Sequence, residues 1–116
     1  MFRIEKIVLN SGLISLIGFA KKAGEMDTGF EAVRRGVQKG KTAFILLDES
    51  IAANSLRRIT AMAKRQDTPV YIVAGKTADS RLFEITGNKI LGMHRGGLSR
   101  GFSNKLRDSE RNKVAK

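Results

Sequence analysis

The sequence predicts an α/β protein, a three-layer α/β/α sandwich with a small central mixed sheet. Buried strands and helices of ten or more residues alternate along the chain, and this order is typical of a mixed or mainly parallel sheet with helices on both faces. The chain has 116 residues, which is enough for one domain but too few for two hydrophobic cores.

Three segments have the character of strands. The clearest is residues 42–47, a continuous apolar run between Gly40 and Asp48 that is typical of a strand covered on both faces. Residues 69–74 form a second such run, which begins with Pro69, and a strand tolerates proline at its first position. Residues 89–94 are a third, shorter strand.

Apolar residues at helical spacing predict the helices. The first covers residues 11–23, where Leu13, Leu16, Ile17 and Ala20 share one face. After a short segment at residues 25–28, further helices are expected over residues 29–39, 52–65, 79–86 and 98–107.

One domain is expected over residues 1–106. The remaining residues, 107–116, are highly charged and are expected to form a flexible C-terminal tail, as chain ends without apolar periodicity commonly do.

The charge is the unusual part of the composition. The chain has 22 Lys and Arg against 11 Asp and Glu, a net charge of +11. Such an excess attracts polyanions, so nucleic acid is the first class of partner and an anionic membrane surface the second. The basic residues gather in segments that could converge on one edge of the sandwich, although any single run also fits an ordinary solvated helix face. These segments are Lys21 with Lys22, residues 34–41, and residues 95–105.

Residues for catalysis are scarce. The chain has no cysteine and one histidine, His94, which excludes thiolate zinc sites, disulfides and a cysteine nucleophile. The glycines do not have the spacing of a phosphate-binding loop or a dinucleotide fingerprint. We therefore expect no catalytic residue, no metal and no cofactor, and we expect the protein not to be an enzyme.

The apolar run over residues 7–20 resembles a secretory signal because Arg3 and Lys6 precede it. Against export, Asn10 and other polar residues interrupt the run, and Lys21 directly follows it. It is also too short to span a membrane. The sequence therefore favours a cytoplasmic protein with no membrane partner.

Four segments resemble a known family. Residues 16–24 read Leu-Ile-Gly-Phe-Ala-Lys-Lys-Ala-Gly; Thr28-Gly29 is followed by Glu31, Val33, Arg35 and Gly40; residues 43–47 are a strand; and Gly87-Asn88-Lys89 continues to Gly101-Phe102. Over residues 12–106 the chain thus resembles the kink-turn-binding ribosomal protein superfamily (the L-seven-Ae and L-thirty-e type), and most closely its small bacterial YlxQ-like branch. The resemblance implies an α/β/α sandwich that binds RNA and is not an enzyme.

The resemblance also implies where RNA binds. In relatives that bind kink-turns, a Gly-x-Asn-Glu-x-x-Lys segment at the start of the second helix enters the RNA major groove at tandem sheared G·A pairs. Aligned without gaps, this segment falls on residues 29–35, where Gly29 matches and Arg35 replaces the lysine. Glu31 stands at the Asn position and Ala32 at the following acidic or amide position. Asn both donates and accepts hydrogen bonds, whereas ionised Glu only accepts them.

A second contact region in the family is the loop before the last strand, here residues 86–91, which packs apolar and backbone groups against flipped-out bases. Arg95 and Arg100 are further candidates for RNA contact that follow from their charge and not from the family resemblance. The candidate RNA-binding residues are Gly29, Phe30, Glu31, Arg34, Arg35, Lys39, Asn88, Lys89, Ile90 and Arg95.

Together these observations predict an RNA-binding ribosomal or ribosome-associated protein that recognises structured RNA, with kink-turn RNA as the family's target, by a basic helix edge and a neighbouring loop. The alternative is a protein-interaction module on the same fold with only non-specific RNA affinity. Binding to double-stranded DNA ranks third, because no recognition helix with an identifiable turn motif is apparent.

Overall fold

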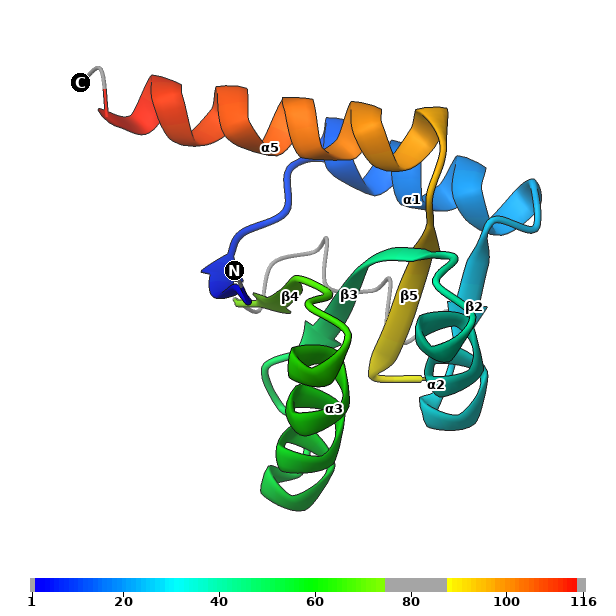
Figure 1. Cartoon of the computed structure of the whole chain (residues 1–116). Helices are drawn as coiled ribbons and strands as arrows, with labels where there is room; N and C mark the ends of the chain where they lie inside the picture. The colour runs from blue at the N-terminus through cyan, green and yellow to red at the C-terminus, as the bar shows by residue number, and fades with distance from the viewer. Residues whose placement is uncertain (1, 75–87, 115–116) are drawn as a thin grey trace.

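The computed structural model of the chain describes residues 2–74 and 88–114 (Figure 1). The helix predicted over residues 79–86 lies outside the described residues. Within them, no helix is long and apolar enough to cross a membrane.

The described strands form one five-stranded sheet in the order β1-β4-β3-β5-β2. β1 (Ile4–Ile7), β3 (Thr42–Asp48) and β4 (Val70–Val73) are parallel, with β4 in the middle of the three. β5 (Ile90–His94) is antiparallel to both β3 and β2 (Met26–Thr28). The sheet is therefore mixed, as predicted.

Among the described elements, two helices cover each face of the sheet (Figure 1). α1 (Ser11–Lys22) and α5 (Gly97–Val114) lie on one face, and α2 (Phe30–Gln38) and α3 (Ala53–Arg65) lie on the other. β3 contributes to both cores because its residues alternate between the faces: Phe44 and Leu46 point toward α1 and α5, and Ile45 and Leu47 toward α2 and α3. The three-layer sandwich expected from the sequence is confirmed.

The strand directions define two edges of the sheet, which are named here because the candidate residues divide between them. At the carboxyl edge, β1, β3 and β4 end, β5 begins and α2 begins. At the amino edge, β3 and β4 begin, β5 ends at His94, and α5 begins.

The described elements predicted from apolar periodicity are present, and most of their boundaries lie within one residue of the prediction. Three elements differ from it: β1, β2 and α5. β1 and β2 were not expected as strands; both are short edge strands, and neither has the apolar pattern of a buried strand. The terminal helix was expected to end near Arg107, but it continues to Val114 through part of the segment expected to be a tail. The apolar run over residues 7–20 contributes Leu13, Ile17 and Ala20 of α1 to the core.

Candidate nucleic-acid interface

The two predicted contact segments meet at the carboxyl edge. The backbone N–H of Gly29 donates a hydrogen bond to the carbonyl oxygen of Ile90, with an N to O distance of 2.9 Å. Gly29 directly precedes α2 and has φ of +89°, in the region that favours glycine. A Cβ atom at this position would lie 3.2 Å from Oδ1 of Asn88. Gly29 therefore allows the start of α2 and the segment before β5 to pack closely.

Phe30 and Ile90 anchor this junction in the core. Ile90 is buried, and Phe30 is partly buried against the same core cluster. The guanidinium carbon of Arg58, on α3, lies 4.3 Å from the centre of the Phe30 ring, which is cation–π geometry. Both apolar candidates thus hold the start of α2 against the sheet, and the polar part of the junction is supplied by Asn88 and Lys89.

Glu31 and Arg34 form an ion pair on the surface of α2. The shortest of their contacts joins Nη2 of Arg34 to Oε2 of Glu31 at 2.7 Å, and Nε donates to the same oxygen at 3.2 Å. The hydrogen bond and positive charge of Arg34 lower the pKa of Glu31, with smaller contributions from Arg35 and Arg58. Arg34 also donates to Oε1 of Gln38 at 3.3 Å. The charge of Glu31 is therefore compensated locally, and Arg34 is held along its own helix.

Arg35 of α2 and Lys39, which directly follows α2, are exposed cations. They are four residues apart and so lie on one side of the helix. Within the described residues, neither side chain has a hydrogen-bond or ion-pair partner. These two side chains are available for an external anion.

Arg95 lies at the amino edge, away from the junction. Its Nε donates to the carbonyl oxygen of Gly40 at 3.0 Å, and its backbone N–H donates to that of Lys41 at 2.9 Å. Since Arg95 directly follows β5, which begins at Ile90, the two residues are separated by about 16 Å along the strand direction. The ten candidate residues therefore do not form one site. Seven lie at the carboxyl edge, Lys39 and Arg95 at the amino edge, and Arg35 between them on α2.

The expectation that the basic segments converge on one edge is met in part at the amino edge, because Arg34 and Arg35 of the segment over residues 34–41 lie elsewhere along α2. α1 ends there with Lys21 and Lys22, and the backbone joins this end to β5 through a hydrogen bond from His94 N–H to the Glu25 carbonyl oxygen. Lys41 and Arg95 complete the convergence.

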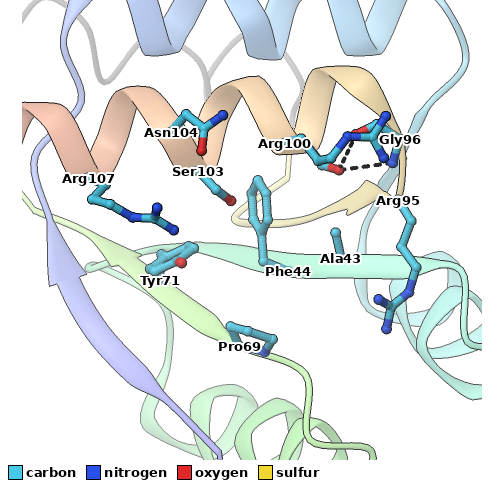
Figure 2. Close-up of a pocket in the computed structure, with 11 residues that line it drawn as sticks. Ala43, Phe44, Pro69, Tyr71, Arg95, Gly96, Arg100, Ser103, Asn104 and Arg107 are labelled. Carbon is cyan, nitrogen blue, oxygen red and sulfur yellow. Dashed lines mark hydrogen bonds between the residues drawn. The ribbon is translucent and has the colours of Figure 1, made fainter.

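The structure has a groove at the same edge that the sequence did not predict (Figure 2). It lies between α5 and the beginnings of β3 and β4 and has a volume of about 490 Å³. Arg95, Arg100 and Arg107 line it, together with polar side chains such as Ser103 and Asn104. The sequence shows that residues 95–105 are basic, but only the course of α5 across the sheet shows that Arg100 and Arg107 share one groove with β3 and β4.

The single histidine lies in a buried polar cluster under α2. Nε2 of His94 is 3.0 Å from Oδ2 of Asp27, and each side chain is 18% exposed. Neither atom has a hydrogen bond of acceptable geometry with the described residues, so the short distance marks packing rather than a well-directed bond. No group of three or more His, Cys, Asp or Glu within the described part of the chain could hold a metal ion.

The sheet order and the two helical layers define a three-layer α/β/α sandwich, in which the junction of Gly29 with β5 brings two loops together at the carboxyl edge. Neither a protein-family model nor a curated protein sequence matches the chain. Among solved structures, the chain is similar to a protein of unknown function from Bacillus halodurans, with 21% identity over 84% of this chain and 99% of that one and a TM-score of 0.71.

Two further similar structures have functional descriptions. One is the 15.5 kD RNA-binding protein of Giardia lamblia, with 11% identity over 87% of this chain and 92% of that one and a TM-score of 0.65. The other is an archaeal translation termination factor, with 23% identity and a TM-score of 0.57; the match covers 69% of this chain but 23% of the factor. At these identities the comparisons establish a shared fold.

Proposed function

We propose that the protein binds structured RNA through the carboxyl edge and acts as a ribosomal or ribosome-associated protein without catalytic activity. The observation that carries the proposal is the junction of Gly29 with Ile90 and Asn88, which places the start of α2 beside the segment before β5. The net charge of +11 supports a polyanionic partner. The fold shared with an RNA-binding protein and with part of a translation factor supports RNA and the ribosome as its setting.

The start of α2 supplies the first group of contacts. The N–H groups in the first turn of a helix have no partner within the helix, and the helix dipole adds partial positive charge there. At this end of α2, the backbone N–H groups can donate to phosphate or base oxygens, while Arg35 adds a full positive charge one turn further on.

Glu31 changes how a base would be read at this edge. As an ionised carboxylate it offers acceptors only, and Arg34 already occupies Oε2. We therefore propose that recognition of a kink-turn by this chain depends on RNA shape and backbone contacts more than on hydrogen bonds from residue 31.

The proposal is tested by binding of the purified protein to a kink-turn stem–loop and to a control in which Watson–Crick pairs replace the tandem sheared G·A pairs. We expect log affinity to fall steeply with log salt, because phosphate contacts release counterions. Tighter binding to the kink-turn would support kink-turn recognition, and equal binding would leave another structured RNA as the target. The absence of binding at moderate salt would contradict the proposal.

Replacing Arg35 by alanine tests the edge itself. If Arg35 contacts one phosphate, the slope of log affinity against log salt should become shallower by about 0.7–0.9, and affinity should fall severalfold at low salt. Arg57→Ala is the matched control, since Arg57 is an exposed α3 residue that hydrogen-bonds to Asn54 in its own helix. Equal effects of the two substitutions would remove Arg35 from the interface.

The protein-interaction alternative has one structural observation in its favour. Phe19 of α1 is 59% exposed, and Val8 before α1 is 49% exposed. An apolar interface at these residues would respond weakly to salt, which separates it from phosphate binding in the same titration.

A further inference from the structure

The groove at the amino edge is rich in arginine and has no carboxylate among its lining residues. A second hollow of about 270 Å³ shares Pro69, Tyr71, Ser103 and Arg107 with it and adds Arg3 and Glu5. Because the two hollows share these lining residues, they are together called the α5 groove here; its four arginines are Arg3 before β1, Arg95 directly after β5, and Arg100 and Arg107 of α5.

The α5 groove is built on a well-packed floor. Phe44 lies edge-on to Tyr71, with ring centres 5.4 Å apart, and 4.9 Å from the ring of Phe102. Phe44 and Phe102 are fully buried, so they hold α5 at a fixed height above β3 and β4. Above this floor, Arg100 and Arg107 are seven residues apart on α5, which places them on the same side of the helix.

The arginines at the two ends of the α5 groove are placed differently. Figure 2 shows Arg107 extending from α5 toward Tyr71 of β4. Arg95 lies at the other end, where its Nε is bonded to the carbonyl oxygen of Gly40. That bond fixes the Arg95 side chain and leaves the donors of its two terminal nitrogens for another acceptor.

The α5 groove differs from the hollow between α2 and α3 in how many of its arginines already have a partner. That hollow, of about 370 Å³, is also lined by three arginines, Arg34, Arg58 and Arg65. Two of the three are already engaged, because Arg34 pairs with Glu31 and Arg58 lies over Phe30. In the α5 groove Arg3 pairs with Glu5, but Arg95, Arg100 and Arg107 have no carboxylate partner among the described residues. The α5 groove therefore has the stronger unmatched positive charge, and planar guanidinium groups suit bidentate contact with phosphate.

A row of cations connects the α5 groove to the carboxyl edge. Arg35 and Lys39 lie along the exposed side of α2, and Lys41 follows the end of that helix. The backbone hydrogen bond between Arg95 and Lys41 then joins this row to the α5 groove. An RNA strand bound at the start of α2 could thus follow these cations along the surface to the α5 groove.

We propose that the α5 groove is a second RNA-binding site, which holds backbone phosphates of the same RNA that contacts the carboxyl edge. The inference rests on the proposed RNA-binding function and adds a site to it. Arg100 and Arg107 provide the phosphate contacts, and Arg95 connects the two surfaces.

The double variant Arg100→Gln/Arg107→Gln tests this site. Both residues are exposed, so the variant should fold, and circular dichroism and thermal unfolding would check this. The matched control is Arg57→Gln/Lys64→Gln on α3, because each double variant lowers the net charge from +11 to +9. The probe is a kink-turn stem–loop with long helical arms, compared with the same RNA after its arms are trimmed.

For the long RNA we expect the groove variant to bind roughly tenfold more weakly at moderate salt and to have a shallower salt slope by about 1.4–1.8, the value for two phosphates. The α3 control should lose much less, and the trimmed RNA should not distinguish the two variants. If both double variants behave alike on the long RNA, the inference is overturned while the proposed function stands. If the wild-type protein binds neither RNA, the proposed function itself fails.

A crosslinking experiment locates the contact. Since the chain has no cysteine, Ser103→Cys creates a unique attachment point for a photoactivated crosslinker within the α5 groove. Ser15→Cys, on the exposed surface of α1, is the control. RNA should crosslink to position 103 and not to position 15; equal yields, or none at position 103, would contradict the inference.

Discussion

At Gly36, the absence of a side chain allows α2 to pack closely against the sheet. Gly36 lies in the middle of α2 and is buried. A Cβ atom there would lie 2.6 Å from Oδ2 of Asp27 and 2.7 Å from Oγ1 of Thr42. Thr42 is buried and β-branched, and the Asp27 oxygen is 3.0 Å from His94, so neither oxygen can retreat without disturbing a neighbour.

Gly36→Ala should therefore destabilise the protein, by about 1–3 kcal/mol, as expected for overpacking. Chemical denaturation would measure the change in the free energy of unfolding. The matched control is Gly18→Ala in α1, where an added Cβ has no neighbour within 4 Å. There the better helix propensity of alanine should stabilise the protein by up to about 1 kcal/mol. Similar effects at both positions would show that the contacts with Asp27 and Thr42 do not limit the packing of α2.

The sequence predicts some of these residue roles and not others. Gly29 and Asn88 were identified through the family resemblance, and the structure places them in contact distance. The position of Gly36 over Asp27 and Thr42 could not be predicted, because it depends on how β2 and β3 lie under α2. The bond between Arg95 and Gly40 joins residues 55 positions apart, and local patterns carry no information about such a pairing.

At the scale of elements, α1 begins with a side-chain cap. Oδ1 of Asn10 accepts a hydrogen bond from the backbone N–H of Leu13 at 2.9 Å. The cap satisfies one of the N–H groups that the first turn leaves without a helical partner. It also fixes the start of the helix at Ser11, a short loop after the end of β1 at Ile7.

Asn10→Ala should destabilise the protein by about 1 kcal/mol and lower the Tm by roughly 4 °C. Asn10→Asp is the control, since its carboxylate keeps the acceptor and interacts favourably with the helix dipole. Thermal unfolding of the three proteins would measure both effects. A Tm for Asn10→Ala equal to that of the wild type would mean that water replaces the cap without cost.

The elements with strong apolar periodicity were the ones that the sequence predicted. β3 and β4 are continuous apolar runs, and α1, α2 and α3 have apolar residues at helical spacing. β1 contains Glu5 and Lys6, and β2 has three residues, so neither has a pattern; pairing with β4 and β5 makes them strands. α5 extends beyond Arg107 over residues that have no apolar stripe, and only Glu110, Arg111 and Lys113 among them are strong helix formers.

At the scale of the whole molecule, the positive charge opposes folding as well as attracting polyanions. The net charge is +11, and ion pairs such as Arg3 with Glu5 and Lys6 with Glu49 are largely solvated. Solvated pairs of this kind contribute little to stability, whereas the excess of like charge favours expansion of the chain.

Sodium chloride should therefore stabilise the free protein. Raising its concentration from 0.05 to 0.5 M shortens the Debye length well below 10 Å and screens the repulsion, so the Tm should increase by a few degrees. A lower Tm at high salt would show that the ion pairs outweigh the repulsion.

The division of the candidate site is also a property of the whole molecule. Charge patterning predicted basic segments at one edge, and the family resemblance predicted contact segments beside α2. That these are opposite edges of one sheet follows from the strand order, which no local pattern in the sequence specifies.

The same strand order has a consequence for synthesis of the chain. Ile4 of β1 pairs with Val70, and Met26 of β2 pairs with Met93. Neither edge strand has a partner until the chain has been made at least as far as β4 or β5, so the N-terminal third cannot complete its part of the sheet while it emerges. Long-range pairing of this kind slows folding. During synthesis, β1 therefore stays unpaired until β4 has been made, and β2 stays unpaired for longer, until β5 has been made.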